Sequence, residues 1–108
     1  MAFDESLALR VRNLISPYGK DILEKRMFGG LTFLYKGKIS VGIVKDELVV
    51  RYIESEHPDL LLNPNVRPMD FTKKPMKEFV YVGQDAFSND SELFEWIKMG
   101  IAHAESKS

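Results

Sequence analysis

The chain opens with a helical pattern of hydrophobic positions. Apolar residues recur at steps of three and four: Phe3, Leu7, Val11, Leu14, Ile15 and Tyr18. This spacing predicts a helix that buries one face. Asp4 is a typical N-cap residue, and the pair Pro17 and Gly19 predicts the end of the helix.

From about Met27 the hydrophobic period changes to two, which predicts strands. We expect one strand up to Tyr35, a second over 39–44 and a third over 48–53. Lys36-Gly37 and the tripeptide at 45–47 are short turn signals between them. Such short connections predict an antiparallel meander. Ile39, Val41 and Ile43 would share one face of it.

The second half predicts a short helix at 55–62, an irregular extended segment at 66–76 and a further strand at 79–82. A final helix would begin after Asn89, a good N-cap with Glu92 three residues on. Its buried positions would be Leu93, Phe94, Ile97, Ile101 and Ala104. The sequence therefore predicts one α+β domain over 1–108, in two layers, with helices on one face of an antiparallel sheet.

Composition narrows the functional classes. The chain has 108 residues, a formal net charge of -1 and no cysteine. The missing thiols exclude a disulfide scaffold, a thiolate nucleophile and a cysteine-ligated metal. Without a basic excess, we expect direct DNA binding to be weak or absent. The first residues do not resemble a signal peptide, and no apolar run has transmembrane length, so we expect a cytoplasmic protein without a membrane contact.

The residues that could carry catalysis show no converging pattern. His57 and His103 are the only histidines, and they are distant in sequence and lack cysteine companions. Each is expected at the surface or partly buried, because a zinc site needs three or four converging ligands. Turn formation explains Asp46, and helix-dipole stabilisation explains Asp90. We therefore expect no enzyme activity, no cofactor and no metal.

Two segments are candidates for binding. The first is the interruption of the strand at Gly29-Gly30, which predicts a β-bulge that shapes a shallow surface. The candidate binding residues there are Arg26, Phe28, Gly29 and Gly30. The second is the most basic stretch of the chain, where charge and aromatic rings could combine. Its candidate residues are Arg67, Met69, Asp70, Phe71, Lys74 and Lys77. The competing interpretations are that the first segment is a bulge without a binding role and that the second is an ordinary solvated loop.

Three blocks in this order resemble the N-terminal domain of the TfoX/Sxy family. They are RMFGGL at 26–31, KDEL at 45–48, and RPMDFT at 67–72 followed by KPMK at 74–77 and FVYV at 79–82. The resemblance implies the order α-β-β-β-α-β-β-α, like the type III secretion chaperones. It also implies kinship with bacterial competence regulators that act with the cyclic-AMP receptor protein. Many short members carry cysteines where this chain has Ser40 and Val41.

The leading hypothesis is a non-enzymatic regulatory or adaptor domain that binds protein. The alternatives are a nucleic-acid-binding module that uses 67–77, and a small-ligand binder or enzyme that uses 26–30. We also expect a homodimer, because both alternating sets of strand positions are apolar: Leu48, Val50 and Tyr52 on one face, Val49 and Ile53 on the other. A solvated outer face would normally be more polar.

Overall fold

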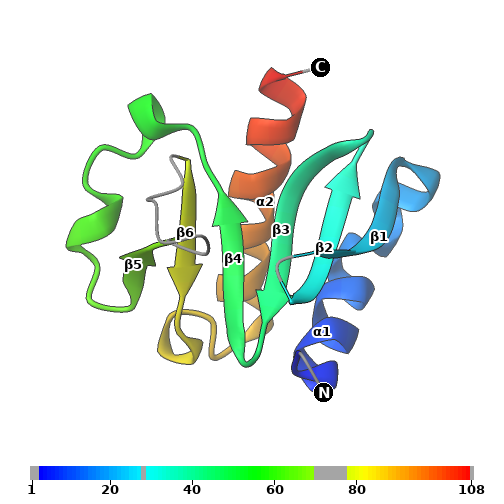
Figure 1. Ribbon diagram of the computed structural model, residues 1–108, viewed down its shortest axis with the longest axis horizontal. Helices are drawn as coiled ribbons and strands as arrows, with labels where there is room; N and C mark the ends of the chain where they lie inside the picture. The colour runs from blue at the N-terminus through cyan, green and yellow to red at the C-terminus, as the bar shows by residue number, and fades with distance from the viewer. Residues whose placement is uncertain (1–2, 28, 70–77, 108) are drawn as a thin grey trace.

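The computed structural model describes residues 3–27, 29–69 and 78–107. One six-stranded antiparallel sheet forms the front layer in Figure 1, and two helices lie behind it. The helices are α1 (Glu5–Ile15) and α2 (Asp90–Ser106). The strands are β1 (Ile22–Met27), β2 (Gly30–Tyr35), β3 (Lys38–Val44), β4 (Glu47–Arg51), β5 (Val66–Pro68) and β6 (Phe79–Val82).

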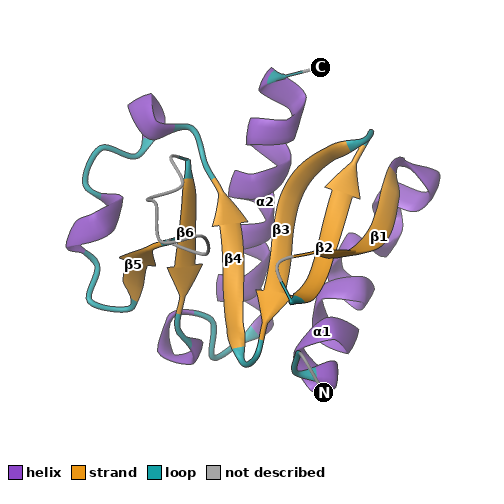
Figure 2. Ribbon diagram, in the orientation of Figure 1, coloured by secondary structure: helices purple, strands orange, loops and turns teal. Residues whose placement is uncertain are grey.

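The predicted class is confirmed: the domain is α+β, with an antiparallel sheet in the order β1-β2-β3-β4-β6-β5. Figure 2 shows both helices on the same side of it. Several local predictions were wrong. The helix expected at 55–62 is a pair of single 3₁₀ turns, Glu54–Glu56 and Leu60–Leu62. Pro58 separates them, because proline disfavours the helical conformation of the preceding residue, here His57.

Another difference is β1, which the hydrophobic pattern did not predict. Its four central residues are exposed and mostly charged, as suits an outer strand, so they carry no alternation. Gly29 and Gly30 consequently do not interrupt a strand. Gly29, with a φ of +74°, lies in the turn between β1 and β2, and Gly30 begins β2 opposite Met27. The bulge predicted there is absent from this hairpin.

A bulge occurs instead in β3, at Ser40. Phe33 pairs with Val41, and Leu34 pairs with Ile39, so that Ser40 is the extra residue. Its buried hydroxyl donates a hydrogen bond to the Phe33 carbonyl at 2.8 Å. The bulge places Ile39 on the face of the sheet opposite to Val41, which corrects the prediction that the two share a face.

The main core lies between the sheet and the helices. Its largest fully buried side chains come from both layers: Phe33, Ile43, Leu48, Phe87, Leu93 and Ile97. Helix α2 touches the sheet most closely at Gly100. A Cβ atom there would lie 2.3 Å from the Ser40 carbonyl oxygen, closer than any real Cβ contact. Only glycine therefore lets α2 lie directly on the bulge of β3.

A second, smaller cluster covers part of the opposite face. Val49, Met69, Phe79 and Tyr81 are buried there, and Ile39 and Val44 pack against them. The apolar outer positions of β4 and β6 are thus covered within one chain. This cluster removes Val49 from the apolar surface on which the expectation of a homodimer rested.

The contact between Gly100 and Ser40 makes a testable prediction about stability. Replacing glycine by alanine inside a helix normally stabilises a protein by about 0.5–1 kcal/mol. We expect Gly100→Ala to lower the free energy of unfolding instead, by about 1–3 kcal/mol, since the new methyl group forces α2 away from β3. Denaturant unfolding measures the change. Gly83→Ala is the control, because its Cβ would lie 3.6 Å from its nearest neighbour, Asn65 O. A stabilised Gly100→Ala variant would contradict the close approach.

Candidate functional site

Two arginines of the segments singled out in the sequence lie at opposite edges of the sheet. Arg26 belongs to β1 and Arg67 to β5, and these are the two outermost strands (Figure 2). Four strands separate them. Among the described residues of the two segments, Arg26 and Arg67 therefore do not come together in one site.

At the first edge, the Arg26 guanidinium lies 5.9 Å from the centre of the Phe3 ring. This cation–π contact joins the end of β1 to the residues before α1. Gly29 and Gly30 form the adjoining hairpin, and Phe28 lies outside the described residues. Arg26 and Gly29 are exposed, Gly30 is buried at the start of β2, and the paired residues of β1 and β2 contain no bulge.

At the second edge, Arg67 stacks on the Tyr81 ring, with 4.3 Å between the guanidinium carbon and the ring centre. It also pairs with Glu47 of β4, so its charge is partly neutralised. Met69 is fully buried in the second cluster, where it serves as core. Asp70, Phe71, Lys74 and Lys77 lie outside the described residues.

A buried polar pair that the sequence analysis did not predict joins α2 to the sheet. His103 was expected at the surface or partly buried, but its relative exposure is 0%. Its Nε2 lies 3.0 Å from Oε2 of Glu78, the residue before β6. The spacing along the helix could have predicted this burial, because His103 follows Gly100 by three residues on the buried side of α2. Its Nδ1 is buried and has no hydrogen-bond partner among the described residues.

Electrostatics at this pair favour a charged carboxylate. The hydrogen bond from His103, opposed by desolvation, holds the pKa of Glu78 below its ordinary value. The nearby charges of His103, Lys107 and Arg51 act in the same direction, with Arg51 Nη2 3.8 Å from Glu78 Oε1. Burial, with Glu54 and Glu78 nearby, raises the pKa of Tyr52. The arrangement fastens the C-terminal part of α2 to the sheet.

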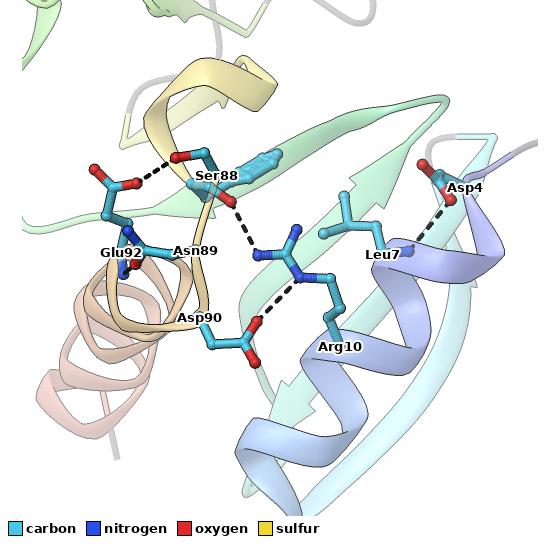
Figure 3. A network of polar contacts seen from close by, with 8 residues as sticks. Asp4, Leu7, Arg10, Ser88, Asn89, Asp90 and Glu92 are labelled. Atoms are coloured by element: carbon cyan, nitrogen blue, oxygen red, sulfur yellow. Dashed lines mark hydrogen bonds and ion pairs between the residues drawn. The ribbon is translucent and has the colours of Figure 1, made fainter.

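At its other end, α2 is fastened to α1 by Arg10, as Figure 3 shows. The Arg10 Nε lies 3.1 Å from Asp90 Oδ1, and Nη2 donates to the Phe87 carbonyl at 3.0 Å. Asp4 caps α1, and Asn89 caps α2 by accepting from Glu92 N at 2.8 Å. A hollow of about 350 Å³ lies beside this junction. Two of its polar side chains already serve the structure, because Arg10 joins the two helices and Asp4 caps α1.

A third feature is a groove of about 420 Å³ along α2, here called the Trp96 groove. Its lining residues come from α2, from the segment before β5 and from the 3₁₀ turn Gln84–Ala86: Asn63, Asn65, Asp85, Ala86, Glu92, Glu95, Trp96 and Met99. Trp96 was expected to serve core or dimer packing. It packs partly against the core, and its Nε1 donates to the Ala86 carbonyl at 2.9 Å.

These sites offer contacts for binding rather than a cluster of metal ligands. Within the described ranges, no group of three or more histidine, aspartate or glutamate residues could hold a metal ion. Nor does any helix in that part of the chain combine the length and apolarity needed to cross a membrane.

Comparison with known proteins identifies the domain type. The model of the family described as the TfoX N-terminal domain matches residues 13–104, which is most of the chain. No curated protein matches the sequence.

The pair of Glu78 and His103 predicts how stability depends on pH. Because folding lowers the pKa of Glu78 from 4.5, the pair stabilises the fold above that pH, and this contribution is lost as the pH falls through the folded-state pKa. We expect Glu78→Gln to lower the free energy of unfolding at pH 7 by about 1 kcal/mol and to flatten its acid dependence. Urea unfolding at a series of pH values from about 3 to about 7 measures both. Glu56→Gln, on an exposed 3₁₀ turn, is the control. An unchanged acid dependence in Glu78→Gln would refute this role.

Proposed function

Because the chain belongs to the TfoX N-terminal domain family, we propose that it is a non-enzymatic regulatory domain that acts in the cytoplasm by binding another protein. The resemblance to competence regulators supports a role in the control of transcription. Under this proposal the domain supplies a recognition surface, and its partner makes the contact with the promoter.

The observation that carries the proposal is an exposed apolar surface beside the Trp96 groove. Leu61 and Leu62 are 50% and 80% exposed, and they are followed directly by Asn63, which lines the groove. Trp96 and Met99 add large, partly exposed apolar side chains on α2. Exposed apolar residues that occur singly are ordinary, but a contiguous group usually marks a binding surface.

The pairing of polar residues between structural elements supports the same proposal. Arg10 and Asp90 join the two helices, and Glu78 and His103 join α2 to the sheet. Groups held in such pairs contribute to the structure, whereas catalysis requires acids and bases placed where a substrate can reach them. These contacts favour a binding domain over an enzyme.

The proposal predicts a protein partner in the native cell. A tagged chain, cross-linked in living cells and purified under stringent washing, should retain one protein in near-stoichiometric amount. The retained protein should survive nuclease treatment, because the contact is between proteins. Loss of all retained material after nuclease treatment would favour the nucleic-acid alternative and contradict the proposal.

For nucleic acid, we expect only weak binding. Arg67 is paired with Glu47, and the chain carries a formal net charge of -1, so few counterions would be released on DNA binding. Fluorescence anisotropy with labelled duplex DNA should show a weak affinity that changes little with salt and is independent of sequence. Tight, sequence-specific binding at physiological salt would support the alternative.

We also propose a homodimer, which would use a different part of the sheet from the one expected from the sequence. Leu23, Leu34 and Ile39 are cross-strand neighbours on β1, β2 and β3, on the outer face of the sheet. Leu23 is 62% exposed. This row is now the best apolar surface for a second copy, since the outer positions of β4 and β6 are covered by the second cluster.

The homodimer predicts a concentration-dependent mass. Leu23→Lys should shift the midpoint of dimerisation upward by at least tenfold, because it places a charge in the apolar row. Light scattering across a dilution series measures this shift. Leu9→Lys, on the exposed side of α1, is the matched control and should leave the midpoint unchanged. A monomer mass for the unmodified chain at every concentration would contradict the dimer.

A further inference from the structure

The Trp96 groove has a preformed apolar floor. The hydrogen bond from Trp96 Nε1 to the Ala86 carbonyl fixes the indole ring before any partner arrives. Met99 lies three residues further along α2 and therefore on the same side of the helix. A fixed tryptophan beside a flexible methionine is a combination common at the centre of protein interfaces.

The charged residues that line this floor have one sign, although Lys98 partly neutralises one of them, Glu95. Asp85, Glu92 and Glu95 line the groove and are exposed, and the lining contains no lysine, arginine or histidine. Lys98 pairs with Glu95, and Ser88 donates to Glu92, but both carboxylates remain at the surface. Since the whole chain is nearly neutral, the negative rim reflects a local arrangement of charge.

Leu61 and Leu62 are exposed apolar residues that precede Asn63, a lining residue of the groove, in the chain. The neighbouring Leu60 packs against the main core, which anchors this 3₁₀ turn. The side chains of Leu61 and Leu62 are thereby left in solvent on a turn held at the edge of the domain.

We infer that the Trp96 groove docks a basic amphipathic segment of a partner protein. Bulky apolar side chains of that segment would pack on Trp96 and Met99, and its lysine or arginine residues would pair with Asp85, Glu92 and Glu95. This inference rests on the proposed protein-binding function and names the chemistry of the partner. The negative rim is what selects this occupant, because it is complementary to a basic segment and repels an acidic one.

Trp96 is the only tryptophan of the chain, so its fluorescence reports on the groove directly. The probe is a set of 12-residue peptides selected from a random phage-displayed library on the folded chain. We expect enriched sequences that combine lysine or arginine with bulky apolar residues. Their synthetic versions should shift Trp96 emission to shorter wavelength as water is displaced from the ring.

The double variant Asp85→Lys and Glu95→Lys should bind these peptides about tenfold more weakly, since attraction at the rim becomes repulsion. Glu54→Lys with Glu56→Lys makes the same change in net charge on a turn that does not line the groove, and it should bind normally. Thermal unfolding checks that both variants fold. If the first does not, Glu95→Lys alone, against Glu56→Lys, makes the same comparison.

Several outcomes would overturn the inference. These are a failure to enrich any peptide, enrichment of neutral or acidic peptides, binding that leaves Trp96 emission unchanged, and equal affinity in the groove and control variants. The protein retained from cells distinguishes a failure of this inference from a failure of the proposed protein-binding function. A partner retained equally by the groove and control variants would leave protein binding intact and show that the groove is not its site.

Discussion

The close approach of α2 to the bulge of β3 determines the layout of the whole domain. The extra residue, Ser40, sits where Gly100 has no side chain, so helix and strand can touch through their backbones. This contact fixes the depth of α2 against the sheet. Leu93 and Ile97 then enter the core, while Trp96 reaches only its margin. The exposure of the Trp96 groove therefore follows from the distance between α2 and the sheet.

Polar contacts near the two ends of α2 help the Gly100 contact to fix the position of the helix. Arg10 links the first turn of α2 to α1, and His103 links the C-terminal part to Glu78 at the start of β6. A helix held at its middle and near both ends has little freedom to roll or slide. The surface that it presents is consequently rigid, which lowers the entropic cost of binding a partner.

The sequence predicted those features that depend on neighbouring residues. The periodicity of α1 and α2, their caps at Asp4 and Asn89, and the antiparallel meander followed from local pattern and turn chemistry. Features that depend on distant residues were missed. Strand β1 is defined by its pairing with β2, and the bulge at Ser40 by its fit to Gly100.

In the candidate site, too, features that depend on neighbouring residues could be predicted and features that depend on distant residues could not. The spacing of His103 could have predicted its burial, but Glu78 is 25 positions away in the chain, and nothing local indicated their pairing. The Trp96 groove was equally hidden, because its wall comes from three separate segments. Arg26 and Arg67, which belong to the segments that stood out as motifs, lie on the two outermost strands of the sheet instead.

The two proposed surfaces are compatible because they lie on different parts of the molecule. The row of Leu23, Leu34 and Ile39 is on the outer face of the sheet, at the β1 side. The Trp96 groove is on the helical side, next to the segment that leads into β5. A second copy seated on the row would leave both grooves open, and two-fold symmetry would present them as a pair. A partner carrying two basic segments could then engage both at once, and the second contact would form at a high effective concentration. Weak docking at each groove would in that case suffice for stable assembly.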